Sequence, residues 1–263
     1  MSGSLIYVAS GFLVGGLVGL TGVGGGSIMT PLLMLLFGQS PAVAVGTDLM
    51  FSATTKIAAT VSFGYARRID WKILRRLAIG SIPGAISVLV WFWLSRHSPG
   101  VVDRVIPRCL GIALGVTAIG LLLQTRLLRF ATKSANPPVE QSEGYKPLIT
   151  VVVGVLLGVA VTLTSVGAGA LGTVALFWLY PQRLTGDKLV ATDIAHALPI
   201  TLIAGVGHAT LGHVNVPVLA SLLIGSIPGV LLASRAAIRL PTAVTRVLIA
   251  IVLLVVSQRM LAA

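Results

Sequence analysis

Residues 79–84 read Ile-Gly-Ser-Ile-Pro-Gly, and residues 224–229 read the same six letters. Before these segments, the Thr-Asp dipeptide at residues 47–48 recurs at residues 192–193, and a glycine-rich match precedes it in each half. The three matches keep their order and lie at a nearly constant offset along the chain. Chance is a poor explanation for this arrangement, so the sequence predicts two similar halves.

The composition is that of a membrane protein. Of the 263 residues, 56% are hydrophobic and 10% are charged, and the mean hydropathy is +0.99. A soluble domain usually carries about 25% charged residues, so this chain has too few charges to coat a water-facing surface. The apolar residues also form long runs, close to the roughly 20 residues that cross a bilayer. We therefore expect an all-α polytopic membrane protein with two repeats of about five hydrophobic segments each.

A polar stretch over residues 124–146 is the only convincing linker. We expect a first membrane repeat over residues 1–123, a cytoplasmic linker over 124–146 and a second repeat over 147–263. The expected apolar segments are 5–21, 28–37, 43–65, 73–94 and 105–123 in the first half, and 148–164, 170–180, 189–206, 216–234 and 244–260 in the second. The second segment of each half is too short for an ordinary span.

The basic residues give the orientation of the two halves. The net charge is +12, but Lys and Arg lie mostly between the apolar runs, which favours membrane topology over nucleic-acid binding. The loop after the third segment holds Arg67, Arg68, Lys72, Arg75 and Arg76, whereas its counterpart at residues 209–217 holds no Lys or Arg. By the positive-inside rule these equivalent loops lie on opposite sides of the membrane, so the repeats are predicted to be inverted.

Glycine-rich breaks over residues 22–27 and 165–170 each precede a short apolar segment. Non-helical backbone cannot face lipid, so we expect both breaks inside the bundle. The helix that starts after each break would present free N–H groups and a positive dipole end, which suit an anion. The residues expected to bind substrate are Gly22, Gly24, Gly25, Gly26, Ser27 and Thr30, with Thr164, Ser165, Gly167, Gly169 and Thr173. The alternative is that these glycines only allow close helix packing.

Two of the seven acidic residues, Asp48 and Asp193, fall near or within apolar runs and are repeat equivalents. A membrane-buried acid costs at least about 2.5 kcal/mol, so retention of both suggests a use in coupling or gating. The alternative is that each carboxylate caps a helix start or bonds to its neighbour, Thr47 or Thr192.

Lys56 follows Asp48 deeper in the same run and either attracts an anion, pairs with an acid or snorkels. His196 lies one turn after Asp193, a position from which it could join a proton relay. A single cysteine, Cys109, excludes a cysteine cluster. We find no convincing metal-ligand spacing, no catalytic motif and no ATP-binding loop, and we expect neither an enzyme nor a cofactor.

The repeated Ile-Gly-Ser-Ile-Pro-Gly segments place two glycines four residues apart, which gives a helix a flat face for close contact. We expect the two helices that carry them to pack against each other. Such faces would also permit a homodimer.

These residues resemble the TauE/SafE family of bacterial membrane proteins. The resemblance lies in residues 22–33 and 44–48, in residues 158–176 and 191–193 of the second half, and in the repeated Ile-Gly-Ser-Ile-Pro-Gly segment. It covers nearly the whole chain. Ser165 and Ala168 stand where the first half has Gly22 and Gly25, so the two breaks differ in sequence.

The resemblance implies a multi-pass exporter of sulfite, sulfoacetate or a related organosulfonate in the bacterial inner membrane. The expected partners are a small anionic substrate and the lipid bilayer. A passive anion channel, or a permease for another small anion, is the alternative function.

Overall fold

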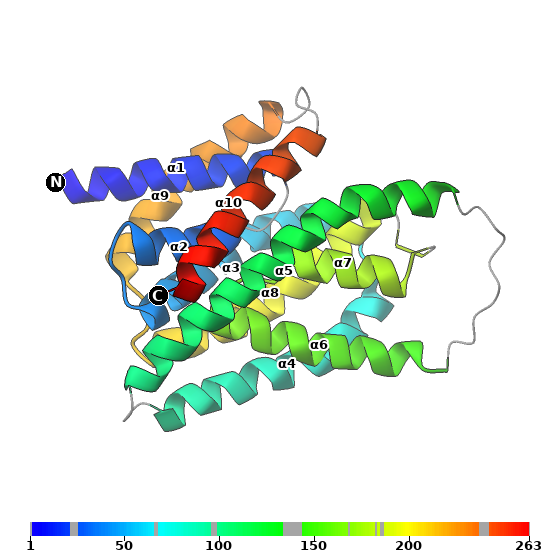
Figure 1. Cartoon of the computed structure of the whole chain (residues 1–263), viewed down its shortest axis with the longest axis horizontal. Coiled ribbons are helices and arrows are strands. Elements are labelled where there is room, and N and C mark those ends of the chain that lie inside the picture. The colour runs from blue at the N-terminus through cyan, green and yellow to red at the C-terminus, as the bar shows by residue number, and fades with distance from the viewer. Residues whose placement is uncertain are drawn as a thin grey trace.

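The computed structural model describes residues 2–21, 26–65, 68–95, 99–133, 144–167, 169–181, 183–184, 187–236 and 242–262. Within these residues every regular element is a helix, which confirms the predicted all-α fold (Figure 1). The helices of the first half are α1 (Ser2–Thr21), α2 (Gly26–Leu35), α3 (Pro41–Tyr65), α4 (Trp71–Leu94) and α5 (Pro99–Lys133). Those of the second half are α6 (Lys146–Thr164), α7 (Ala170–Leu179), α8 (Asp187–Thr210), α9 (Val216–Ala236) and α10 (Thr242–Ala262).

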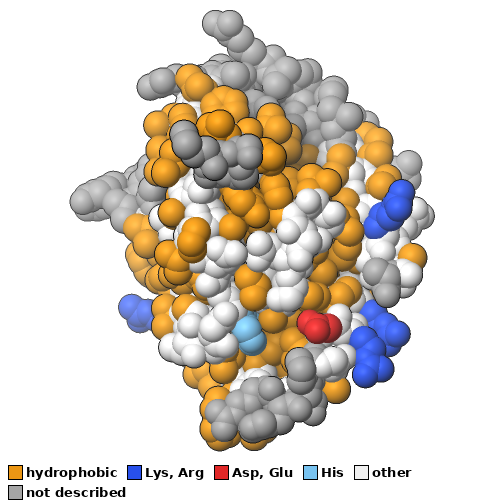
Figure 2. Space-filling model, turned by 90° about the vertical axis from the view of Figure 1, so that its left-hand side faces the viewer, with side chains coloured by type: hydrophobic (Ala, Val, Ile, Leu, Met, Phe, Trp, Pro, Cys, Tyr) orange, Lys and Arg blue, Asp and Glu red, His pale blue; other side chains and the backbone are white. Residues whose placement is uncertain are grey.

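The helices have the lengths and surfaces of a multi-pass membrane protein. Five of the described helices are long and apolar enough to cross a bilayer. By contrast, α2 and α7 have ten residues each, a length of about 15 Å that spans only half of the hydrocarbon core. Hydrophobic side chains predominate on the face in Figure 2, and Leu5, Leu36 and Trp178 are 69%, 73% and 66% exposed. In a membrane these side chains contact lipid.

The two halves interlock. The closest helix pairs each join one helix from either half: α1 packs on α9, α4 on α6, α5 on α10 and α3 on α8 (Figure 1). The pairing of α1 with α9 repeats that of α6 with α4, because α1 and α6 are equivalent, as are α4 and α9. Neither half therefore buries its apolar surface without the other.

Two equivalent hydrogen bonds fix how α3 and α8 run. The backbone N–H of Asn215, just after α8 ends, donates to the Thr47 hydroxyl near the start of α3 over 3.0 Å. The backbone N–H of Asp70, just before α4, donates to the Thr192 hydroxyl near the start of α8, also over 3.0 Å. Because α3 begins where α8 ends, these two equivalent helices are antiparallel.

Small residues allow the outer helix pairs to touch along their backbones. A Cβ added to Gly80 in α4 would lie 1.9 Å from the carbonyl oxygen of Val151 in α6. A Cβ added to the equivalent Gly225 in α9 would lie 1.9 Å from the carbonyl oxygen of Val8 in α1. These distances are far below van der Waals contact, so only glycine fits at either crossing.

The expectation that the two Ile-Gly-Ser-Ile-Pro-Gly helices pack against each other is wrong. Each packs on a helix that has a complementary pair of glycines: α6 supplies Gly154 and Gly158 to α4, and α1 supplies Gly11 and Gly15 to α9. A flat face fits best against another flat face, and α1 and α6 provide one in each half.

The predicted linker is partly helical. Helix α5 continues to Lys133, so residues 124–133 extend this helix past the expected apolar segment, which ends at residue 123. Helix α6 begins at Lys146 with Pro147 in its first turn, a position where the missing N–H of proline costs nothing.

We predict that Gly80→Ala destabilises the protein by about 1–3 kcal/mol, because the added methyl group meets backbone that cannot move aside. The melting temperature of the purified protein in detergent should fall, and Gly225→Ala should act in the same way. Gly100→Ala in α5 is the control, since its Cβ would come no closer than 3.8 Å to the Arg104 side chain. Equal melting temperatures for Gly80→Ala and Gly100→Ala would contradict the close crossing.

Candidate functional site

The break before α7 has the geometry of a chain reversal inside the protein. Ser165 ends α6 in the left-handed conformation with φ of 58°, and Gly167 and Gly169 have φ of 120° and 143°. The Thr164 hydroxyl accepts a hydrogen bond from the Val166 N–H over 3.1 Å and donates to the carbonyl of Ala160 over 2.6 Å. Thr164, one of the predicted substrate ligands, is therefore engaged in holding the reversal. In the first half, Gly22, Gly24 and Gly25 lie outside the described residues, and α2 begins at Gly26.

A threonine on each short helix binds a carboxylate on the helix that follows. In the first half, the Thr30 hydroxyl donates to Asp48 Oδ2 over 2.5 Å and joins α2 to α3. In the second half, the Thr173 hydroxyl donates to Asp193 Oδ2 over 2.9 Å and joins α7 to α8. These four residues were all predicted site residues, and the structure brings them together in two matching pairs.

One alternative for Asp48 and Asp193 was a hydrogen bond to the neighbouring threonine. The described residues show no such bond. Thr47 and Thr192 turn away from the carboxylates and accept the backbone N–H groups of Asn215 and Asp70. Their hydroxyls therefore secure the starts of α9 and α4, which leaves Asp48 and Asp193 to the short helices.

Several buried oxygens around the pairs have no hydrogen-bond partner within the described residues. They include Oδ1 of Asp48 and of Asp193 and the hydroxyls of Ser27, Ser52 and Ser165. The Ser165 hydroxyl lies near Asp48 without bonding to it. An unsatisfied buried polar group costs about 1–3 kcal/mol, so such a group is usually completed by water or by a ligand. This concentration of unpaired polar atoms marks the interior around α3 and α8 as the candidate site.

Lys56 places one positive charge in this interior. Its side chain is 7% exposed, and it interacts electrostatically with both Asp48 and Asp193. The repeat equivalent of Lys56 is Thr201, whose hydroxyl donates to the carbonyl of Ala197 on its own helix. The interior therefore has two matching acids but an unmatched cation.

His196 has a different environment from the two acids. One ring nitrogen, Nε2, lies 3.0 Å from the Ser81 hydroxyl in α4, and the ring also bonds to the backbone of Leu77. Both contacts hold α8 against α4. The structure thus places His196 at a helix crossing and does not place it in hydrogen bonding to Asp193.

Gly172 is a site residue that the sequence did not reveal. A Cβ added there would lie 2.0 Å from Oδ1 of Asp193, so the carboxylate rests directly on the backbone of α7. The sequence shows this glycine only as one of several small residues near the break.

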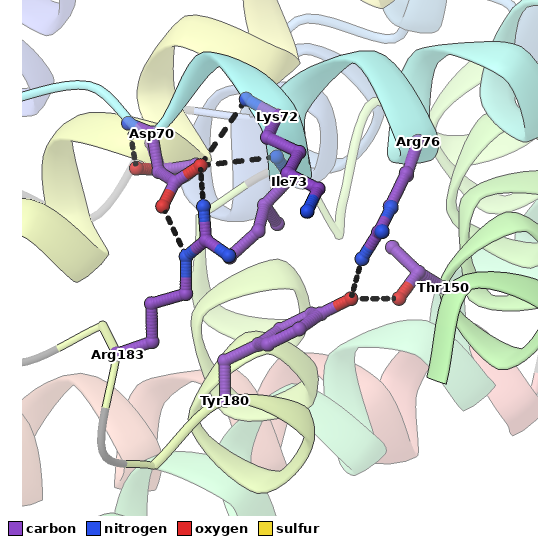
Figure 3. A network of polar contacts seen from close by, with 8 residues as sticks. Asp70, Lys72, Ile73, Arg76, Thr150, Tyr180 and Arg183 are labelled. Atoms are coloured by element: carbon purple, nitrogen blue, oxygen red, sulfur yellow. Dashed lines mark hydrogen bonds and ion pairs between the residues drawn. The ribbon is translucent and has the colours of Figure 1, made fainter. Parts of the chain in front are cut away.

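A second polar network closes one end of the bundle (Figure 3). Asp70 caps α4 by accepting the backbone N–H groups of Lys72 and Ile73 over 3.1 and 3.2 Å. The same carboxylate accepts Nε and Nη2 of Arg183, in the segment after α7, over 2.6 and 3.0 Å. Burial alone would raise the pKa of Asp70, but the bonds from Arg183 and from the helix start hold this pKa below its usual value. Asp70 therefore stays ionised and ties the first half to the second.

Tyr180 adds a neutral link beside this ion pair. Its hydroxyl accepts Nη1 of Arg76 in α4 over 3.4 Å and lies 2.7 Å from the Thr150 hydroxyl in α6 (Figure 3). Three helices, α4, α6 and α7, are thus joined at this end. The sequence presents Asp70 and Arg183 as loop charges more than a hundred residues apart, so their pairing had no local signal beyond an aspartate at a helix start.

Comparisons with known proteins bear on what this site serves. A family model described as "Sulfite exporter TauE/SafE" matches residues 7–260. The chain belongs to this family. It is 37% identical to the probable membrane transporter protein YjnA of Bacillus subtilis over 242 residues, which cover 88% of this chain and 89% of the relative. It is 26% identical to the probable membrane transporter protein YunE of the same organism over 231 residues, or 80% of each chain. No solved structure matches the chain.

A further relative, a probable membrane transporter protein of Xylella fastidiosa, is 24% identical over 226 residues. The TauE/SafE match and these relatives show a membrane transporter of that family. The names of these relatives indicate transport but do not specify a substrate.

We predict that Gly172→Ala destabilises the protein through Asp193. The added methyl group must displace the carboxylate, whereas in an Asp193→Ala background the space is free. The two substitutions should therefore be non-additive, with a coupling of about 0.5–3 kcal/mol, measured from melting temperatures in detergent. Gly120→Ala is the control, because its Cβ would make an ordinary 3.5 Å contact with Val174 of α7. Additive effects of Gly172→Ala and Asp193→Ala would rule out the close contact.

Proposed function

We propose that this TauE/SafE transporter is a secondary transporter that exports a small sulfur-containing anion, such as sulfite, sulfoacetate or another organosulfonate, across the bacterial inner membrane. The observation that carries the proposal is Lys56, a buried cation beside two buried threonine–aspartate pairs, in a chain whose family is described as sulfite exporters. Little water is present to screen the charge of a buried cation, so Lys56 would attract an incoming anion in addition to Asp48 and Asp193.

The hydrogen-bond donors for the anion would come from both halves. In the first half these are Ser27 and the N-terminus of α2 from Gly26, and in the second Ser165, which has an unpartnered buried hydroxyl. Gly167 and Gly169 keep the chain in conformations that other residues rarely adopt, and their role would be to bring the N-terminus of α7 toward the site. Gly22, Gly24 and Gly25, which precede α2 in the sequence, remain predicted substrate ligands.

The arrangement of the helices supports alternating access. The equivalent helices α3 and α8 are antiparallel, which agrees with inverted repeats, and each carries one acid of the site. In such transporters one set of helices rocks against another around a central site. An inside-negative potential favours outward movement of a negative charge by about 2.3 kcal/mol per 100 mV, so export needs no ATP.

The experiment that tests this function is uptake of labelled sulfite into inside-out vesicles or proteoliposomes, with taurine, sulfoacetate, thiosulfate and sulfate as competitors. We expect saturable uptake and countertransport. Uptake that neither saturates nor shows countertransport would indicate a channel, and no uptake of any of these anions would refute the sulfur-anion proposal.

We predict that Lys56→Gln lowers the initial rate of sulfite transport at least about tenfold, since about 1.4 kcal/mol of lost anion binding is enough for that effect. Arg259→Gln is the control, because it removes an exposed cation near the end of α10. If the Lys56→Gln variant transports sulfite as fast as the Arg259→Gln variant, Lys56 is not part of the substrate site. Protein amounts and melting temperatures of both variants should be compared with those of the unchanged protein.

We predict that Asp48→Asn and Asp193→Asn each alter the pH dependence of transport. Each substitution keeps the size of the side chain and an oxygen for Thr30 or Thr173 but removes the proton-binding carboxylate. Because sulfite itself binds a proton near neutral pH, each variant is compared with the unchanged protein at the same pH, and the ratio of the two transport rates should change with pH. An unchanged pH profile in both variants would leave the membrane potential as the driving force.

A further inference from the structure

A pocket of about 320 Å³ opens at the end of the bundle where α4 and α8 begin. Its lining includes Arg68, Lys72, Arg183 and Lys188, together with Asp70 and Trp71. Among the described residues of this lining, four are basic and one, Asp70, is acidic. Both oxygens of Asp70 already accept hydrogen bonds, from Arg183 and from the start of α4, so the described lining carries a net positive charge.

The pocket has no cationic counterpart in the repeat. The local backbone is the same at both ends, since Thr192 accepts the N–H of Asp70 as Thr47 accepts that of Asn215. The side chains differ in kind. Asn215 replaces Asp70, and the equivalents of Arg68, Lys72 and Lys188 are His213, Pro217 and Val43. The positive charge of this pocket is therefore missing from its repeat equivalent and is not required by the repeated fold.

The position of the pocket suits traffic between water and the site. Two apolar spans, Trp71–Leu94 and Lys188–Thr210, begin at it, so it lies at a membrane boundary. Trp71 is 56% exposed there, as is common for tryptophan at the bilayer surface. The loop charges predict that this end is cytoplasmic. Thr192 accepts the backbone N–H of Asp70 in the pocket lining, and the next residue, Asp193, accepts the Thr173 hydroxyl in the candidate site. The first turns of α8 therefore connect the pocket with the candidate site.

Given the transport function proposed above, we propose that this pocket is the cytoplasmic receiving site for the oxyanion, held by Arg183, Lys72 and Lys188. The shared chemistry is that of a sulfite, sulfonate or phosphate group, which a basic pocket binds through charge-assisted hydrogen bonds. An arriving oxyanion competes with Asp70 for Arg183. It thereby weakens the ion pair that ties α4 of the first half to the α7–α8 segment of the second.

Trp71 makes the pocket observable without any transport measurement. A protein with Trp91, Trp93 and Trp178 replaced by Phe keeps Trp71 as its only tryptophan. In phosphatidylcholine vesicles, quenching of its fluorescence by iodide reports the local anion concentration, and quenching by neutral acrylamide reports exposure alone. Sulfite should protect Trp71 from iodide in a saturable way, and sulfate at equal ionic strength measures how selective that protection is.

We predict that Lys72→Gln combined with Lys188→Gln lowers the iodide quenching constant by roughly threefold, because the local anion concentration follows the local potential. Acrylamide quenching should not change, and Arg104→Gln, an exposed cation on α5, should leave both constants unchanged. Asp70→Asn should make sulfite protect at lower concentration, since Arg183 loses its competitor. Equal iodide quenching in the double variant and the parent, or no protection by sulfite, would overturn the proposal.

Two further experiments are needed. The first distinguishes a lipid headgroup from the substrate as the bound oxyanion, and the second separates the pocket proposal from the proposed export function. If phosphatidylglycerol vesicles lower the quenching of Trp71 by neutral acrylamide as well as by iodide, while sulfite does not protect in phosphatidylcholine, a lipid headgroup occupies the pocket and the substrate assignment is wrong. Lys56→Gln, which should slow transport at least about tenfold, should leave sulfite protection of Trp71 intact. Protection without transport in the unchanged protein would therefore refute the export function and preserve the pocket.

Discussion

The burial of two carboxylates, Asp48 and Asp193, constrains the structure around them. A charged group inside the bundle is tolerated only where hydrogen bonds and opposite charge replace water. Here each acid receives a threonine hydroxyl from a helix of ten residues. In the second half, α7 follows a glycine-rich break whose residues Ser165, Val166 and Gly167 are buried, so the backbone of these residues is shielded from lipid. Break, short helix, threonine and acid thus form one unit that occurs twice.

The interlocked halves keep these two units together. Helices α3 and α8 carry the acids and pack on each other, and the outer pairs α1–α9 and α4–α6 each bind one half to the other. Backbone contact at Gly80 and Gly225 leaves no room for slippage in these outer pairs. The single Lys56 then makes the interior unequal, because its equivalent is a threonine. An anion bound in this interior, as proposed, would have a preferred orientation even though the scaffold is repeated.

Much of this fold was predictable because helix length and hydropathy are local properties. The repeats, the apolar segments and the short helices α2 and α7 follow from the sequence. Thr30 and Asp48 were both predicted site residues, but their hydrogen bond to each other was not predicted. Partners across the bundle were not predictable. Glycine spacing shows that a helix has a flat face but not which helix covers it, so α4 and α9 were paired wrongly. Likewise Thr47 and Asn215, or Asp70 and Arg183, are more than a hundred residues apart, and Gly172 matters only because an acid from α8 rests on it.

The unequal ends of the bundle bear on the proposed direction of transport. A carrier must attract its substrate on one side and release it on the other, so binding that is equally strong at both ends would slow release. The end with Arg68, Lys72, Arg183 and Lys188 concentrates anions, Lys56 holds one positive charge farther in, and the opposite end has Asn215 and Pro217 at the equivalent positions. An anion that follows this gradient meets its strongest attraction first and its weakest last. With an inside-negative potential acting in the same sense, the proposed route therefore favours export when the cationic end faces the cytoplasm.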